Sequence, residues 1–119
     1  MKRANRLRSS RDFQRVRREG TSLRHALLVL TVAPSRRPKP ARCGIVVSRK
    51  MVGHAAQRNR AKRRVREAVR LILAQLEEGV DLIFTVRTAA VGQVPFPTLQ
   101  TAIETLLRRA QVWAPEPKT

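Results

Sequence analysis

A helical pattern of apolar residues between two short apolar runs restricts the fold more than any other feature of this sequence. From Gln57 to Leu76 apolar side chains recur about every 3.6 residues and form one stripe, made of Ala61, Val65, Ala68, Val69, Ile72 and Leu76. Residues 42–48 before this segment and 80–86 after it are mainly apolar runs, typical of buried strands. A strand, a helix and a strand in this order predict a parallel pair within a mixed sheet.

A short basic helix is predicted near the start of the chain. Ser9 is a typical N-terminal cap and Gly20 a typical C-terminal end, and between them Phe13 and Val16 lie on one helical face. A helix this short is stable only when it docks on the rest of a protein, so we expect it to pack.

One more strand and one more helix complete the predicted fold. Residues 26–32 form an apolar run, and we expect this strand to lie antiparallel to residues 42–48 across a proline-rich basic loop. Pro97 opens a final helix, whose inner face carries Leu99, Ala102, Ile103, Leu106 and Ala110. The order α-β-β-(β)-α-β-α, in which the bracket allows one further strand, predicts a single α+β domain over residues 1–113 with a mixed sheet packed by helices. Residues 114–119 are predicted to be a disordered tail.

The positive charge is confined to the first part of the chain. The 119 residues include 26 Lys and Arg against 8 Asp and Glu, a net charge of +18. Residues 1–70 hold 22 of the basic and 3 of the acidic side chains, whereas residues 71–119 hold 4 and 5. Such an asymmetry favours a binding surface for a polyanion over a general device for solubility.

Several classes of protein are disfavoured by composition. Cys43 is the only cysteine, so neither a disulfide framework nor a cysteine-based zinc site is expected. The start of the chain has no apolar run of a signal peptide, and no stretch approaches the ~20 apolar residues of a spanning helix, so we expect a cytoplasmic protein that does not bind membranes. His25 and His54 lie too far apart in sequence to suggest an acid–base pair, and Glu77, Glu78 and Asp81 are more simply read as a helix end than as a metal cluster.

The long helix carries the strongest functional signal. Nine basic residues lie between Arg49 and Arg70, against the single acid Glu67, so pairing within the helix explains few of them. On the face away from the apolar stripe lie Asn59, Lys62, Arg63, Arg66 and Arg70, and near the helix start lie Arg58, Asn59 and Arg60. Guanidinium forks and the free N–H groups of a helix N-terminus both bind phosphate oxygens. The stripe begins with Ala and Val rather than the Trp or Phe of membrane-surface helices, which favours nucleic acid, and a shaped RNA more than a DNA groove.

The residues of this region resemble a known family. The run Arg58-Asn59-Arg60-Ala61-Lys62-Arg63-Arg64-Val65-Arg66-Glu67 resembles the RNR signature of the bacterial ribonuclease P protein subunit. The preceding Gly44-Ile45-Val46-Val47-Ser48-Arg49-Lys50 is similar to that family's strand ending in a basic pair. Asp12-Phe13-Gln14-Arg15-Val16, Asp81-Leu82-Ile83 and the last helix match its layout, so the resemblance covers about residues 5–112.

The resemblance implies a function and two sets of site residues. The protein would be the accessory subunit of a ribonucleoprotein endoribonuclease, one protein per RNA, whose large RNA holds Mg²⁺ and removes the 5′ leader of precursor tRNA; the protein itself would hold no cofactor or metal and no catalytic residue. The signature helix would face the catalytic RNA through Arg58, Asn59, Arg60, Lys62, Arg63 and Arg66, to which its exposed face adds Arg70. The leader would lie in a cleft between the first helix and the sheet, near Phe13, Val16, Arg17, Leu30, Arg49 and Lys50.

The family also implies a left-handed crossover between the parallel strands, against the usual right-handed rule. This chain departs from the family pattern at Arg17 and Leu30, where an aromatic residue is common. Because stacking contributes about 1–3 kcal/mol per base, we expect charge contacts, including Arg17, to dominate leader binding here.

Two other functions remain open from the sequence. A structural RNA-binding protein, such as a ribosomal protein, shares the size and the charge. A self-sufficient nuclease would need clustered carboxylates or a histidine centre, and the sequence offers neither pattern.

Overall fold

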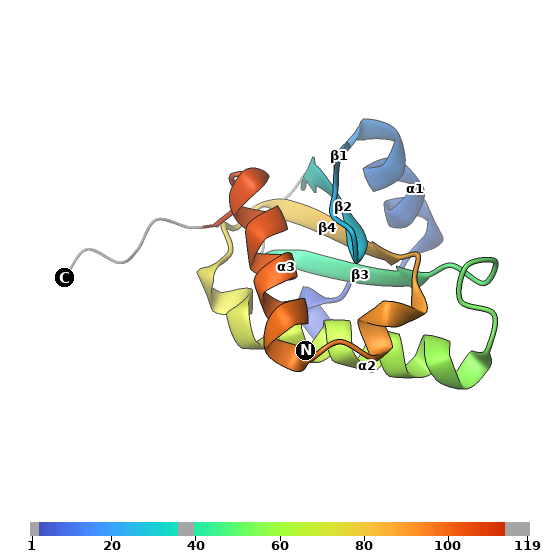
Figure 1. Ribbon diagram of the computed structural model, residues 1–119. Helices are drawn as coiled ribbons and strands as arrows, with labels where there is room; N and C mark the ends of the chain where they lie inside the picture. Colours follow the sequence, from blue (N-terminus) through green and yellow to red (C-terminus); the bar gives the residue numbers. More distant parts are fainter. Residues whose placement is uncertain (1–2, 36–39, 114–119) are drawn as a thin grey trace.

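Three α-helices and four β-strands make up residues 3–35 and 40–113, the part of the chain that the computed structural model describes (Figure 1). The helices are α1 (Ser10–Glu19), α2 (Ala55–Ile72) and α3 (Phe96–Arg109), and the strands are β1 (Thr21–Arg24), β2 (Leu28–Pro34), β3 (Arg42–Val47) and β4 (Val80–Val86). Short 3₁₀ turns η1 (Arg3–Asn5), η2 (Leu73–Gln75) and η3 (Ala89–Gly92) connect them. The predicted element order is confirmed, and β1 is the optional extra strand. The tail predicted over 114–119 lies outside the described residues.

The strands form one mixed sheet in the order β1-β2-β4-β3. β3 and β4 are parallel, as the strand–helix–strand pattern predicted, and β2 pairs antiparallel with β4. The expected pairing of the 26–32 strand with the 42–48 strand is wrong, because β4 lies between them. β4 suits the central place: Leu82, Ile83 and Phe84 are at most 1% exposed, so this strand is covered on both faces. The hand of the crossover through α2 remains a prediction from the resemblance.

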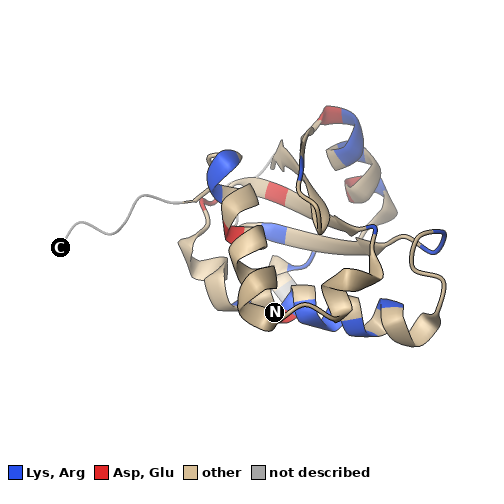
Figure 2. Cartoon of the chain, viewed as in Figure 1, with Lys and Arg blue, Asp and Glu red and all other residues tan. Residues whose placement is uncertain are grey.

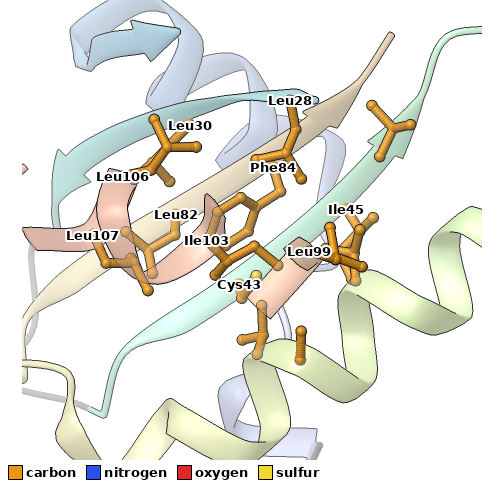
Figure 3. Close-up of a cluster of buried hydrophobic side chains, with 14 of the residues drawn as sticks. Leu28, Leu30, Cys43, Ile45, Leu82, Phe84, Leu99, Ile103, Leu106 and Leu107 are labelled. Carbon is orange, nitrogen blue, oxygen red and sulfur yellow. The ribbon is translucent and has the colours of Figure 1, made fainter. Parts of the chain in front are cut away.

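The two faces of the sheet are covered unequally. α2 and α3 lie on one face, and Leu82, Phe84 and Val86 of β4 join the large core beneath them (Figures 1 and 3). α1 lies on the other face over a smaller cluster of Leu7, Val16, Ala33 and Ile83. The stripe predicted for the long helix is the face of α2 that packs: every member of it is at most 7% exposed. Its charged side is therefore turned outward.

The N-terminal helix begins and ends as its sequence predicts. The Oγ atom of Ser9 accepts hydrogen bonds from the backbone N–H groups of Arg11 and Asp12, at 3.1 and 3.4 Å. Gly20 ends the helix with a 2.8 Å bond from its N–H to the carbonyl of Val16. The capped start fixes where α1 begins on its face of the sheet.

A buried ion-pair cluster fastens α1 to the sheet. Asp81, at the start of β4, is 0% exposed and accepts hydrogen bonds from Arg15 of α1 and Arg42 of β3. Arg42 also contacts Asp12, at 3.3 Å. The hydrogen bond to Asp81 raises the pKa of Arg42 above its ordinary value. The sequence-based view of Asp81 as part of a helix end is therefore wrong, since this carboxylate joins α1, β3 and β4.

Candidate nucleic-acid interface

The outward face of α2 is a surface of cations and one amide. Asn59, Arg60, Lys62 and Arg63 are exposed, and within residues 3–35 and 40–113 none of these three cations forms an ion pair. On the opposite side of the helix Ala61 and Val65 are 0% exposed and hold it against the core. This part of the face that the sequence assigned to RNA is therefore exposed on a helix that the core supports, and Figure 2 shows basic residues along α2.

Two arginines of the same helix are used inside the protein. Arg58 donates from Nη1 to the carbonyls of Val52 and Gly53, at 3.0 and 2.9 Å, and so braces the loop before α2. Arg64 donates from Nη1 to the carbonyl of Val91, at 2.8 Å, and from Nη2 to that of Val94. Arg58 was predicted to bind RNA, but its guanidinium is shared with the loop. Sequence alone could not separate Arg58 from Arg60 and Arg63, whereas Arg64 was not among the predicted RNA-binding residues.

Arg70, at the end of the predicted RNA face, is paired. Its Nε and Nη2 atoms donate to the two carboxylate oxygens of Glu67, at 3.0 and 2.6 Å, on the surface of α2. This contact lowers the pKa of Glu67 and raises that of Arg70. The single acid of the basic helix thus pairs with Arg70, whereas Arg63 has no acidic partner among the described residues.

The open part of the sheet lies beside α1. In β2, β3 and β4, Val29, Val46 and Thr85 are register neighbours on the α1 side of the sheet and are only half-buried. Phe13 lies at the edge of this floor, with its ring directly on Gly44 of β3, so that a Cβ atom at position 44 would overlap the ring. Helical geometry places the exposed Arg17 one turn after Phe13, on the flank of α1 away from Arg15. The structure therefore brings Phe13 and Arg17 together beside an open sheet face.

Two residues assigned to the leader cleft do not reach it. Val16 is 0% exposed and fills the space beneath α1, because the helix packs directly on the sheet through this side chain. Leu30 is also 0% exposed, and it points to the opposite sheet face, where it pairs with Phe84 and packs under α3 (Figure 3). Strand alternation explains the error, since a shift of one residue reverses the face.

The basic pair after β3 has a neighbour that the sequence analysis missed. Arg49 and Lys50 are exposed, and the N–H of Ser48 bonds to the carbonyl of Val86 at 2.9 Å. Arg87, also exposed, therefore follows β4 at the same end of the sheet. Neighbouring parallel strands end at the same edge of a sheet. Basic residues directly after both strands could therefore have predicted that these charges lie close together. The three cations follow the strands at the end of the sheet away from Asp81.

Comparison with known proteins agrees with this geometry. The family model described as Ribonuclease P matches residues 1–111. The chain is 56% identical over 110 residues to the ribonuclease P protein component of Chloroflexus aurantiacus, covering 92% of this chain and 80% of the relative. It is 51% identical over 113 residues to that of Herpetosiphon aurantiacus, covering 95% of this chain and 89% of the relative.

Solved structures give the same answer for the fold. The RNase P protein of Staphylococcus aureus superposes with a TM-score of 0.80 at 28% identity, covering 93% of this chain and 99% of that one. The RNase P protein of Thermotoga maritima superposes with a TM-score of 0.76 at 34% identity, covering 87% and 96%. A structural protein of the ribosome is not favoured by these matches. From its sequence, its sheet order and the basic face of its long helix, this chain belongs to the ribonuclease P protein family.

Proposed function

We propose that this chain binds the catalytic RNA of ribonuclease P through α2 and the 5′ leader of precursor tRNA through the open sheet face beside α1. The observation that carries the first half is the exposed, unpaired face of Arg60, Lys62 and Arg63 on a helix fixed by its opposite side. Each of these cations can neutralise a phosphate, and the rigid helix sets their spacing.

The chemistry of both surfaces suits binding more than bond cleavage. Arginine remains protonated at any physiological pH, so it can hold a phosphate but cannot act as a general base. Phe13 offers a ring and the strand floor offers small apolar side chains. We therefore assign the hydrolysis, and most of the Mg²⁺ that supports it, to the RNA partner.

The leader surface depends more on charge than on stacking. Phe13 is its only aromatic residue within the described chain, and Arg17, Arg49, Lys50 and Arg87 surround the open floor. A single-stranded leader would place its backbone on these cations and one base near Phe13. One protein per RNA is the expected stoichiometry. The cytoplasm is the expected location, because the relatives are bacterial proteins and tRNA precursors are made there.

Reconstitution tests this function. The chain is mixed with a bacterial ribonuclease P RNA, and cleavage of precursor tRNA is measured at low Mg²⁺, where we expect a clear rise over the RNA alone. The Lys62→Gln/Arg63→Gln variant should bind the RNA more weakly, with a smaller dependence on salt. Arg11→Gln/Arg18→Gln, which removes two exposed charges from the outer side of α1, is the matched control. No rise with the native chain would contradict the proposal.

A further inference from the structure

The segment before α1 adds itself to the free edge of β3. The N–H of Leu7 donates to the carbonyl of Cys43 at 3.0 Å, and the Nδ2 atom of Asn5 donates to the carbonyl of Ala41 at 3.1 Å. Leu7 is 4% exposed and belongs to the cluster beneath α1. This part of the chain therefore has a fixed place between β3 and α2 (Figure 1).

The alternation of this extended segment turns two arginines outward. Side chains of an extended chain point to opposite sides in turn, so Arg6 and Arg8 lie opposite the buried Leu7. Both line a groove of about 300 Å³ together with Leu7 between them, with Lys62 and Arg66 of α2, and with Phe13 and residues 43–45 of β3. The described lining of this groove includes four cations, one aromatic ring and no acid.

Arg66, which lines this groove, has a donor atom without an acceptor. Its side chain is partly buried, and its Nε atom is buried with no hydrogen-bond partner among the described residues. The neighbouring Arg58, Arg64 and Arg70 all have acceptors within the protein. Within the described residues Arg66 also forms no ion pair, so an anion that enters the groove would supply the negative partner that its guanidinium lacks.

We propose that this groove is a binding site for one nucleotide, in which a phosphodiester contacts Arg66, Lys62, Arg6 and Arg8 and the attached ribose and base lie against Phe13. The inference rests on the proposed function and deepens it. The groove joins the basic face of α2 to the leader surface, which the sequence had treated as separate. The nucleotide comes from the catalytic RNA or from the leader, and both present the same phosphodiester chemistry.

The test compares two charge-matched double variants. Arg6→Gln/Arg8→Gln removes the N-terminal half of the site, whereas Arg11→Gln/Arg18→Gln removes two exposed charges of α1 that do not line the groove. We expect the first variant to bind its RNA about tenfold or more weakly and to lower the salt slope by up to about 0.7, because the site neutralises one single-strand phosphate. The control should change both quantities much less. Circular dichroism of both variants checks that the fold is retained.

Separate measurements identify the source of the nucleotide. Binding of each variant to the catalytic RNA alone is compared with binding of precursor tRNA to the assembled holoenzyme, with and without a leader. A specific loss in the first measurement assigns the site to the catalytic RNA, and a loss that needs the leader assigns it to the substrate. Equal effects of the two variants in every measurement would overturn the proposal. Failure of the native chain to bind either RNA would instead contradict the proposed function.

A small probe examines the same site in the free protein. Cytidine 3′,5′-bisphosphate should shift the backbone amide signals of Cys43 and Ile45, whereas cytidine should not, because the phosphates supply the attraction. The Arg6→Gln/Arg8→Gln variant should weaken this response, and Arg11→Gln/Arg18→Gln should preserve it. A response of equal size in both variants would also overturn the proposal.

Discussion

Arg15 of α1 donates a hydrogen bond to the fully buried carboxylate of Asp81, 66 residues further along the chain at the start of β4. Arg42 of β3 completes the arrangement, with its Nε and Nη2 atoms 2.9 Å from the two oxygens of the same carboxylate. A buried charge of this kind is stable only while its partners are present. The position of α1, and with it that of Phe13 and Arg17, therefore depends on Asp81.

Replacement of Asp81 should destabilise the protein strongly. Asp81→Asn removes the buried carboxylate that Arg15 and Arg42 share and leaves them only the more exposed Asp12 and Glu19. Loss of one partner in a buried pair costs about 3–5 kcal/mol. Urea unfolding followed by circular dichroism measures the change. Glu67→Gln breaks the exposed pair with Arg70 and is the control, with an expected cost below about 1 kcal/mol. A similar small cost for both variants would show that Asp81 does not hold α1 in place.

Gly44 and Phe13 should be energetically coupled. A methyl group at position 44 meets the Phe13 ring, so Gly44→Ala should cost about 1–3 kcal/mol through overpacking. Phe13→Leu removes part of the obstruction, and the double variant should lose less stability than the sum of the two single variants. A double-mutant cycle in urea measures this coupling. If the free-energy changes of the two single variants simply add, the Phe13 ring is not what opposes a methyl group at position 44.

Adjacent arginines of α2 should behave differently. Arg63→Gln removes an exposed cation and should lower the salt slope of RNA binding by about 0.7–0.9 while changing stability by less than about 0.5 kcal/mol. Arg64→Gln removes donors to two backbone carbonyls and should cost about 1–3 kcal/mol of stability while leaving the slope unchanged. Filter binding across a range of salt and thermal unfolding measure the two effects. The reverse pattern would show that the RNA face is misassigned.

Most helices and strands of this protein could be predicted from its sequence because local residue patterns specify them. The stripe from Ala61 to Ile72 is the buried side of α2, and the predicted 80–86 strand coincides with β4. Ser9 and Gly20 cap α1 as their chemistry predicts. The position of β4 between β2 and β3 depends on contacts distant in sequence, so the local patterns suggested the wrong neighbour.

The site could be predicted only in part, for two physical reasons. First, composition does not tell which cations have internal partners, so Arg58 looked equivalent to Arg63. Second, a residue's face on a strand or helix depends on register, so Leu30 was placed at the surface although it is buried. Charge density pointed to α2, and three-dimensional pairing decides which of its cations have no partner within the protein.

Alkaline pH should reveal the burial of Cys43. Burial raises the pKa of its thiol from 9.0 to about 12, so the folded protein keeps the proton in a range where the unfolded chain loses it. Stability should therefore be unaffected by this group below pH 9 and should fall between pH 9 and 12, by up to about 1.4 kcal/mol per pH unit. Urea midpoints of the native chain and of Cys43→Ala, measured from pH 8 to 10, isolate this contribution. Parallel pH profiles would show that the thiol ionises normally.

Replacement of Arg17 by an aromatic residue should change how the leader surface binds RNA. Arg17 stands one turn after Phe13, at the edge of the open sheet face, where we expect its contact with the leader to be electrostatic and to weaken as salt increases. Arg17→Phe exchanges that contact for a second stacking ring, which contributes about 1–3 kcal/mol per base and is little affected by salt. The variant holoenzyme should therefore bind precursor tRNA with a salt slope lower by about 0.7, and it should bind more tightly than the native one at high salt.

A precursor without a leader is the control for this exchange. Its affinity should be the same for the native and Arg17→Phe holoenzymes at every salt concentration, because the ring has no base to stack on. The comparison requires only equilibrium binding of the two substrates over a salt series. An equal change for both substrates would place Arg17 outside the leader path, and an unchanged slope with the leader present would show that this cation makes no phosphate contact.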